Sequence, residues 1–228
     1  MSGTVLEALD RVVEKWGDLP ALQNKHGGDW EGLNWREYSE QAHLAARGFM
    51  ALGVEPGKGV AIIGYNRPKW FISDIAGILA GAVPAGIYTT SAPEQCQYIA
   101  GHCDAQVAVV EDAGQLAKFK KVWGELPQLK AIVMMEGSDS ADNVLSWDEL
   151  IARAEEVPVE ELEQRKQAQK ADDLCTLIYT SGTTGPPKAV MMTHRNYTWT
   201  AQAVIDHVGG FGPDDNVLSY LPLSHVAE

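Results

Sequence analysis

The amino-acid sequence predicts an α/β fold: a mainly parallel sheet with helices on both faces. Short, continuously apolar runs, which are typical of strands buried on both faces, recur along the chain. Between them lie segments whose apolar residues repeat at helical spacing. Three β-α-β units follow one another in this way. Because parallel strands need a crossover connection and a helix usually supplies it, this succession indicates a parallel sheet between two helical layers.

Two amphipathic helices are predicted ahead of the first strand of this sheet. Residues 4–16 carry apolar side chains at helical spacing and are followed by Gly17. Residues 36–52 show the same spacing and are followed by Gly53. A glycine just past the last periodic residue is a common helix stop, because it takes the left-handed conformation without strain.

Strands and helices then alternate. The predicted strands are the apolar runs at residues 60–64, 83–88, 107–110 and 131–134. The predicted helices after them cover residues 68–82, 93–102, 115–123 and, beyond a polar loop, 147–163. The last helix and its surroundings carry much of the acidic excess of the chain, which we expect to be a solvated helix face rather than a metal site. These acidic residues are Glu155, Glu156, Glu160, Glu161 and Glu163.

In the C-terminal part, strands and helices no longer alternate regularly. Two strands, at residues 174–179 and 189–193, flank a polar loop, and a helix at 196–207 and a final strand at 217–221 follow. His194 is explained by its place near the start of that helix. We therefore divide the chain into an N-terminal α/β subdomain (1–170) and a second part with the loop, its two strands and the helix (171–228).

Composition excludes several functional classes. The chain has 228 residues, of which 45% are hydrophobic and 21% charged, as in an ordinary soluble globular protein. Its formal net charge of −13 argues against a nucleic-acid partner, because phosphate backbones are bound by basic faces. The cysteines Cys96, Cys103 and Cys175 are widely spaced with no C-x-x-C pair. This favours reduced thiols over a disulfide framework or a zinc site.

No targeting or membrane-spanning segment is predicted. The first residues carry charged side chains where a signal peptide needs an apolar core. The longest uncharged stretch, 75–93, is interrupted by Gly81, Pro84 and Gly86, so it divides into a helix end and a strand. We expect a cytoplasmic protein, with peripheral contact at the inner face of the membrane left open.

Residues 179–188, with the sequence YTSGTTGPPK, are the chemically most informative segment. Glycines let a backbone bring its N–H groups close to a ligand, hydroxyls add donors and metal ligands, and a lysine adds charge for a phosphate. The Walker P-loop does not fit. That pattern needs adjacent Gly and Lys before a helix, whereas Pro186 and Pro187 separate Gly185 from Lys188 and a strand follows. The alternative is a surface turn that binds nothing.

This segment resembles the phosphate loop of the adenylate-forming superfamily, which contains acyl-CoA synthetases, luciferase-like enzymes and the adenylation domains of peptide synthetases. The family pattern is T-S/T-G-T/S-T-G-x-P-K-G, and the chain departs from it only at Ala189. Residues 66–71 (NRPKWF) and 86–99 are similar to bubblegum-type long-chain and very-long-chain acyl-CoA synthetases. Residues 221–228 (LPLSHVAE) resemble the block L-P-L-x-H-x-x-E of the same enzymes.

The resemblance implies ATP, Mg²⁺ and coenzyme A as ligands and a long-chain fatty acid as substrate. It assigns nucleotide binding to Thr180, Ser181, Gly182, Thr183, Thr184, Gly185 and Lys188. Thr180 would also belong to the Mg²⁺ shell. The resemblance gives catalytic roles to Lys188, which would neutralise phosphate charge, and to His225, which would lie beside the acyl-adenylate. For His225, a structural role in an exposed turn is the alternative.

Family enzymes are longer than this chain, and their metal-binding glutamate, ribose-binding aspartate and C-terminal lysine find no counterpart in it. The sequence thus looks like the first part of the large N-terminal domain of an adenylate-forming enzyme. We expect the parent protein to be an AMP-forming long-chain fatty acid–CoA ligase and the fragment to be inactive alone. A stand-alone nucleotide- or phosphate-binding module is the alternative.

Overall fold

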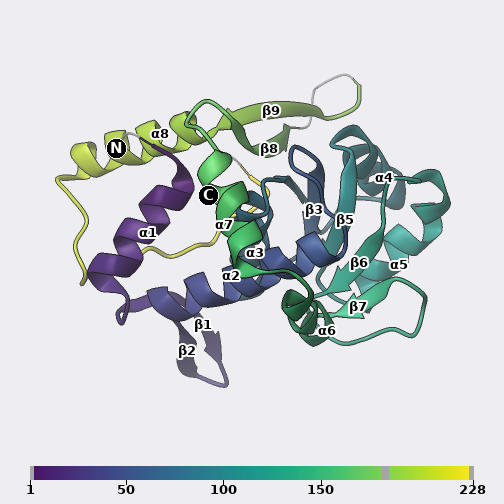
Figure 1. Ribbon diagram of the computed structural model, residues 1–228, viewed down its shortest axis with the longest axis horizontal. Helices are drawn as coiled ribbons and strands as arrows, with labels where there is room; N and C mark the ends of the chain where they lie inside the picture. Colours follow the sequence, from purple (N-terminus) through teal and green to yellow (C-terminus); the bar gives the residue numbers. More distant parts are fainter. Residues whose placement is uncertain (1–2, 181–184, 226–228) are drawn as a thin grey trace.

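A mainly parallel sheet of seven strands organises the part of the chain that the computed structural model describes, residues 3–180 and 185–225 without the side chain of His26 (Figure 1). The strand order is β7-β6-β5-β3-β4-β8-β9, and every neighbouring pair is parallel except β8 and β9. The predicted fold class is confirmed. The strands are β3 (Gly59–Ile63), β4 (Val83–Ile87), β5 (Ala105–Val110), β6 (Ala131–Met134), β7 (Val144–Ser146), β8 (Leu174–Thr180) and β9 (Lys188–Thr193).

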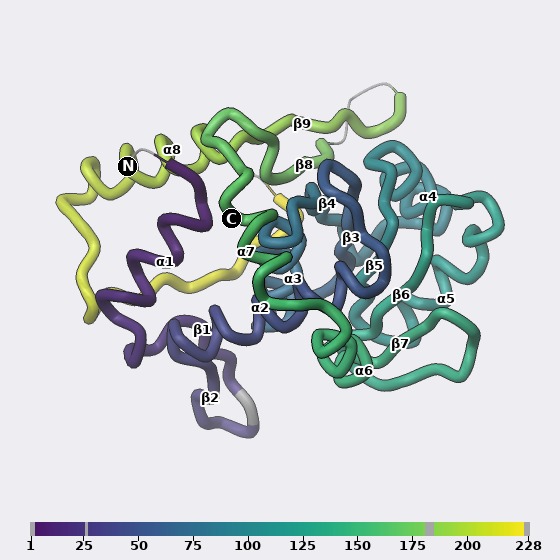
Figure 2. Tube along the Cα trace, in the orientation of Figure 1, coloured from purple at the N-terminus to yellow at the C-terminus, as the bar shows by residue number. Residues whose placement is uncertain are grey.

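Helices lie on both faces of this sheet, as the trace in Figure 2 also shows. They are α1 (Val5–Trp16), α2 (Trp35–Ala51), α3 (Pro68–Leu79), α4 (Pro93–His102), α5 (Ala113–Val122), α6 (Trp147–Ala152), α7 (Val159–Ala168) and α8 (His194–Val208). Two 3₁₀ turns, η1 (Trp123–Glu125) and η2 (Arg153–Glu156), extend α5 and α6. Capping boxes fix several helix starts: in α1, Thr4 Oγ1 accepts from Glu7 N–H at 3.1 Å and Glu7 accepts in return.

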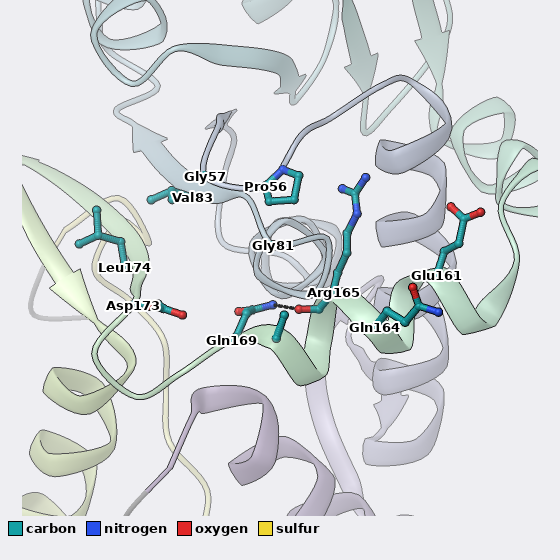
Figure 3. A pocket seen from close by; sticks show the side chains of 11 residues that line it. Pro56, Gly57, Gly81, Val83, Glu161, Gln164, Arg165, Gln169, Asp173 and Leu174 are labelled. Carbon is teal, nitrogen blue, oxygen red and sulfur yellow. Dashed lines mark hydrogen bonds between the residues drawn. The ribbon is translucent and has the colours of Figure 1, made fainter.

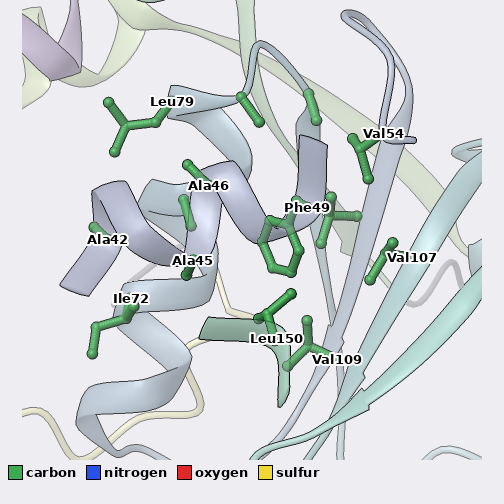
Figure 4. Close-up of a cluster of buried hydrophobic side chains, with 14 of the residues drawn as sticks. Ala42, Ala45, Ala46, Phe49, Val54, Ile72, Leu79, Val107, Val109 and Leu150 are labelled. Carbon is green, nitrogen blue, oxygen red and sulfur yellow. The ribbon is translucent and has the colours of Figure 1, made fainter. Parts of the chain in front are cut away.

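The core is divided between the two faces of the sheet by the alternation of side chains along each strand. On one face, Val107 and Val109 of β5 pack with Phe49 of α2 and the helices α1, α3, α6 and α7 (Figure 4). On the other, Ala108 and Val110 pack beneath α4 and α5. A strand covered on both sides has no polar face, which is why these runs are continuously apolar.

The direction of the chain reverses within the sheet at β3. Helix α3 leads from β3 to β4 on one side, whereas α4 leads back past β3 to β5 on the other. Helix α5, which follows β5, packs on the same face as α4, so the connections after β3 and β5 lie on opposite faces. In open α/β sheets such a switch point opens a crevice at the carboxyl ends of the strands, where ligands bind.

Two predicted elements were wrong. The single helix over 147–163 is broken at Val157, which is extended because it precedes Pro158, and α7 starts anew beyond it. The predicted strand at 217–221 does not form, and Val217 is 80% exposed. Its apolar pattern suits a strand, but no strand of the sheet pairs with it.

A hairpin and a short strand escaped the sequence analysis. Strands β1 (Pro20–His26) and β2 (Asp29–Asn34) pair in antiparallel fashion around Gly27 and Gly28. Both glycines have positive φ, 59° and 110°, which is what a two-residue hairpin loop demands. Strand β7 is too short to show a periodic pattern, and it forms because β6 offers it a parallel edge.

The three cysteines of the chain are buried and free. Burial raises the pKa of Cys96 to about 11 and that of Cys175 to about 12, so these thiols stay protonated and unreactive at neutral pH. Within the described residues, no helix combines the length and the apolar character needed to cross a membrane.

His194 is more than a helix start, because its imidazole joins three distant parts of the chain. It is fully buried; its Nδ1 lies 3.2 Å from Val5 N, and its Nε2 lies 3.1 Å from Gln169 Oε1. Since a backbone N–H can only donate, Nδ1 accepts, and the single ring proton sits on Nε2. This arrangement needs the neutral ring, and burial lowers the pKa of His194.

We therefore expect the protein to lose stability on mild acidification in part through His194. The folded-state pKa lies below the unfolded value of about 6.5, so the neutral ring stabilises fully above that pH. This contribution is lost as the pH falls through the folded pKa. Urea unfolding at pH 7.5 and 5.5 should show a smaller acid loss for His194→Asn than for the wild type. His207→Asn, at an exposed position of α8, is the matched control; an equal acid loss in all three proteins would contradict the assignment.

Candidate functional site

The predicted phosphate loop emerges from an antiparallel hairpin. Strand β8 ends at Thr180 and β9 begins at Lys188, and these two residues are partners across the ladder. Thr180 Oγ1 lies 3.5 Å from Lys188 O, within reach of a weak hydrogen bond, and both side chains are exposed. A hydroxyl donor and a cation thus stand side by side at the mouth of the loop. Ser181, Gly182, Thr183 and Thr184 lie outside the described residues, and their predicted roles stay predictions.

Gly185 takes a conformation that other residues disfavour. Its φ is +111°, and a Cβ added there would meet no atom within 4 Å. Backbone conformation, rather than crowding, is therefore the reason for a glycine at this position.

The base of the loop is braced against α4, which the sequence analysis missed. Tyr179 is buried, and its hydroxyl is hydrogen-bonded to His102 Nδ1 at 2.7 Å, while the two rings meet edge-on. Burial raises the pKa of Tyr179, so the hydroxyl stays protonated. Tyr98 stacks on the same imidazole. The spacing of Tyr98 and His102, one helical turn apart, was the only sequence signal for this brace.

The second predicted segment, which carries His225, lies at the same edge of the sheet. Strands β3, β4 and β8 are neighbours and parallel, so their carboxyl ends meet there. Ser224 is buried against Gly86 of β4, and His225 N–H donates to Pro222 O at 2.8 Å, which closes a turn. His225 itself is exposed. The fold thus brings the regions of Lys188 and His225, distant in sequence, to adjoining strand ends, although the acyl-side role of His225 stays a prediction.

A network of charges around the buried Glu111 lies beside this edge, where β3, β5 and β6 end. Glu111 has a side chain only 2% exposed, and it accepts from Arg67 at 2.6 Å and from Tyr65 N–H at 2.9 Å. Arg67 also contacts Glu136 at 3.0 Å, and Lys69 reaches the same carboxylate at 3.0 Å. Burial raises the pKa of Glu111, an effect that its two partners oppose. These contacts fix the turn between β3 and α3.

The described residues offer little for a metal ion on their own. They contain no group of three or more His, Cys, Asp or Glu side chains that could hold one. Thr180 supplies one exposed hydroxyl, whereas Mg²⁺ takes six oxygen ligands in near-octahedral geometry. The protein side of a magnesium site is therefore incomplete in this part of the chain.

A cavity of about 780 Å³ lies at the opposite edge of the sheet (Figure 3). Its walls include Gly57, Val83 and Leu174, which lie at the amino ends of β3, β4 and β8. Arg165 of α7 lines it, but its guanidinium donates to Val54 O at 2.7 Å and Ala80 O at 3.0 Å. This arginine is thus used to hold the fold, and the cavity is separate from the phosphate loop.

The chain is similar to known proteins over nearly its whole length. The family model described as AMP-binding enzyme matches residues 9–228. The long-chain-fatty-acid–CoA ligase ACSBG2 of Xenopus laevis is 42% identical over 98% of this chain and 31% of its own length. The human long-chain-fatty-acid–CoA ligase ACSBG1 is also 42% identical, over 98% of this chain and 32% of its own length. The chain therefore spans about a third of the length of these relatives.

Solved structures give the same fold. A long-chain-fatty-acid–CoA ligase from Archaeoglobus fulgidus superposes with a TM-score of 0.81 at 23% identity, over 100% of this chain and 44% of that one. The anthranilate–CoA ligase AuaEII in complex with anthranoyl-AMP superposes with a TM-score of 0.73 at 26% identity, over 87% and 36% of the two chains.

The brace between Tyr179 and His102 can be tested by Tyr179→Phe. Removal of one hydroxyl deletes the bond to His102 and leaves the ring packing intact, so the free energy of unfolding should fall by about 1 kcal/mol. Urea denaturation measures this loss. Tyr65→Phe, at a tyrosine that is 54% exposed, is the matched control and should change little. Equal stabilities for Tyr179→Phe and the wild type would show that the contact does not hold the loop base.

Proposed function

The chain belongs to the AMP-binding enzyme family, and from this premise we propose that its parent protein is an AMP-forming long-chain fatty acid–CoA ligase. The observation that carries the proposal is the hairpin that sets Thr180 and Lys188 side by side at the ends of a glycine- and hydroxyl-rich loop. The 42% identity to long-chain-fatty-acid–CoA ligases over nearly the whole chain supports the substrate class.

The proposed reaction has two steps. A carboxylate oxygen of the fatty acid attacks the α-phosphorus of ATP, the bond to the β-phosphate oxygen breaks, and pyrophosphate leaves. The thiolate of coenzyme A then attacks the carbonyl carbon of the acyl-adenylate, and AMP leaves with the bonding electrons. A carboxylate alone is a poor acyl donor because an oxide would have to leave, whereas AMP is a good leaving group.

In this proposal the loop acts mainly through electrostatics and positioning. Negative charge moves onto the departing pyrophosphate in the first step, and donors placed there in advance stabilise it. Lys188 offers an ammonium group, and Thr180 and the loop hydroxyls and N–H groups offer hydrogen bonds to the β- and γ-phosphates. The net charge of −13 makes such local positive charge necessary for binding a polyanion.

Mg²⁺ belongs to the proposal only as the partner of the triphosphate. When bound, it would neutralise phosphate charge. Of the residues described, Thr180 is the one whose hydroxyl could join its ligand shell, and carboxylate ligands would have to come from elsewhere in the parent protein.

An exposed apolar surface on β9 and α8 fits a role within a longer protein. Met191 and Trp199 are 64% and 69% exposed, and Val204 and Val208 of α8 are about half exposed. Strand β9 is the last strand in the sheet order, so its outer edge is unpaired among the described residues. Apolar patches of this kind mark interfaces, and we propose that the remainder of the ligase covers this one. The relatives named above are ligases, so a stand-alone phosphate-binding module is not favoured.

The role of the loop predicts a selective loss of the first step in the parent-length protein. Lys188→Ala should lower the rate of pyrophosphate release with ATP and palmitate by about 10²- to 10³-fold, because a charge aimed at the leaving group is removed. Thr183→Ala should also lower it. Stability should be retained for Lys188→Ala, since the side chain is exposed. Lys121→Ala, at an exposed lysine of α5, is the control. Normal turnover by Lys188→Ala would mean that the site is misassigned.

The isolated 228-residue chain should make no acyl-adenylate and should bind ATP weakly. Adenylation needs the loop together with metal-binding, ribose-binding and charge-stabilising groups that this part of the protein does not provide. Pyrophosphate release and isothermal titration with ATP check the two statements. Robust turnover by the fragment would overturn the proposed division of the site.

A further inference from the structure

One side chain at the carboxyl edge of the sheet is not used by the chemistry above. Asn66 lies in the turn between β3 and α3, and its amide spans to the segment 219–225, some 150 residues further along the chain. Its Nδ2 donates to Ser219 Oγ at 2.9 Å and to Leu221 O at 2.6 Å. Its Oδ1 accepts from Leu223 N–H at 3.3 Å.

These three contacts use both hydrogens and the oxygen of the amide. An asparagine amide carries the same donor and acceptor as a peptide group, so Asn66 binds this segment much as a neighbouring strand would. The segment itself forms no strand. Asn66 thereby supplies this backbone with polar partners of the kind that a β-ladder would otherwise supply.

The turn that carries Asn66 is itself held in place. Both of its neighbours in the sequence are bound to the buried Glu111: Tyr65 through its N–H at 2.9 Å and Arg67 through its guanidinium at 2.6 Å. Pro68 then starts α3. A side chain placed between two anchored residues has little freedom, so it can hold a partner segment precisely.

Gly86 of β4 is a second point at which the same segment contacts the sheet. A Cβ added to Gly86 would lie 2.9 Å from Ser224 Cα, so the backbone of Ser224 rests directly on the strand. The φ of Gly86 is not positive, and close approach is therefore the reason for a glycine here. His225 follows at once, exposed, in the turn closed by Pro222.

We propose that Asn66 is a positioning residue for acyl-group activation, which holds the segment 219–225, and with it His225, over the carboxyl ends of β3 and β4. The inference rests on the proposed ligase function for its catalytic consequence and on geometry alone for the anchor. The hydrogen bonds of Asn66 go to Ser219, Leu221 and Leu223. They do not involve Thr180 or Lys188, the described residues at which β8 ends and β9 begins beside the phosphate loop. Loss of Asn66 should therefore affect the fatty acid side of the site and spare the ATP side.

The test uses the parent-length protein with Asn66→Ala and Gly86→Ala, which release the same segment by different routes. In Asn66→Ala, hydrogen exchange at the Leu223 amide should be at least about tenfold faster, because its acceptor is gone. In both variants, kcat/KM for palmitate should fall at least about tenfold while KM for ATP stays within about twofold. Asn24→Ala, at an exposed position of β1, is the control for both readouts.

Unchanged exchange at Leu223 in Asn66→Ala would overturn the anchor. Faster exchange with an unchanged kcat/KM for palmitate would overturn the positioning role. Parallel losses on the ATP and palmitate sides would do the same, since they indicate general damage to the fold. A wild-type protein that releases no pyrophosphate would refute the ligase function, and with it the catalytic consequence, while the exchange measurement would still decide the anchor separately.

Discussion

Parallel pairing of β3, β4 and β8 is the constraint on which the rest of the structure depends. Register pairs such as Ala61 with Ala85 and Ala85 with Leu177 align the three strands in one direction, so all their carboxyl ends fall on one edge. Because parallel strands need crossovers, helices must cover both faces, and the strands must then be apolar throughout. The polar residues of the candidate site are thereby concentrated in the turns that leave this edge. That arrangement places three features at one edge: the phosphate loop, the turn that carries Asn66, and the contact of Ser224 with Gly86.

The ion pair between the buried carboxylate of Glu111 and the guanidinium of Arg67 holds the turn at this edge of the sheet, although burial of the charge costs free energy. Burying charges is unfavourable unless the geometry and further hydrogen bonds compensate, and here the Tyr65 N–H and the shared contact of Arg67 with Glu136 do so. One atom, Arg67 Nε, is buried without a partner among the described residues. Such a network adds little net stability, but removal of one member leaves an uncompensated charge. We therefore interpret it as a device that fixes the conformation of one turn, which in turn fixes Asn66.

Sequence patterns predicted most helices and strands within a residue or two, because burial imposes local periodicity. The errors have physical reasons. Proline after Val157 divides a helix that continuous amphipathic spacing had joined, and the signal was present in the sequence. The apolar residues near Val217 look like a strand, but a strand exists only if a partner edge is free to pair with it. The reverse holds for β7, whose three residues form a strand because β6 accepts them.

The sequence by itself determined the fold class, the start and end of the main elements and the chemical character of the loop at 179–188, since these follow from local spacing and residue type. Only the tertiary structure decided the strand order, the burial of His194 between Val5 and Gln169, the brace from His102 to Tyr179 and the anchoring of the His225 segment by Asn66. Each of these joins residues that are far apart along the chain. No local pattern encodes such contacts, because they exist only after loop closure has brought the parallel strands together.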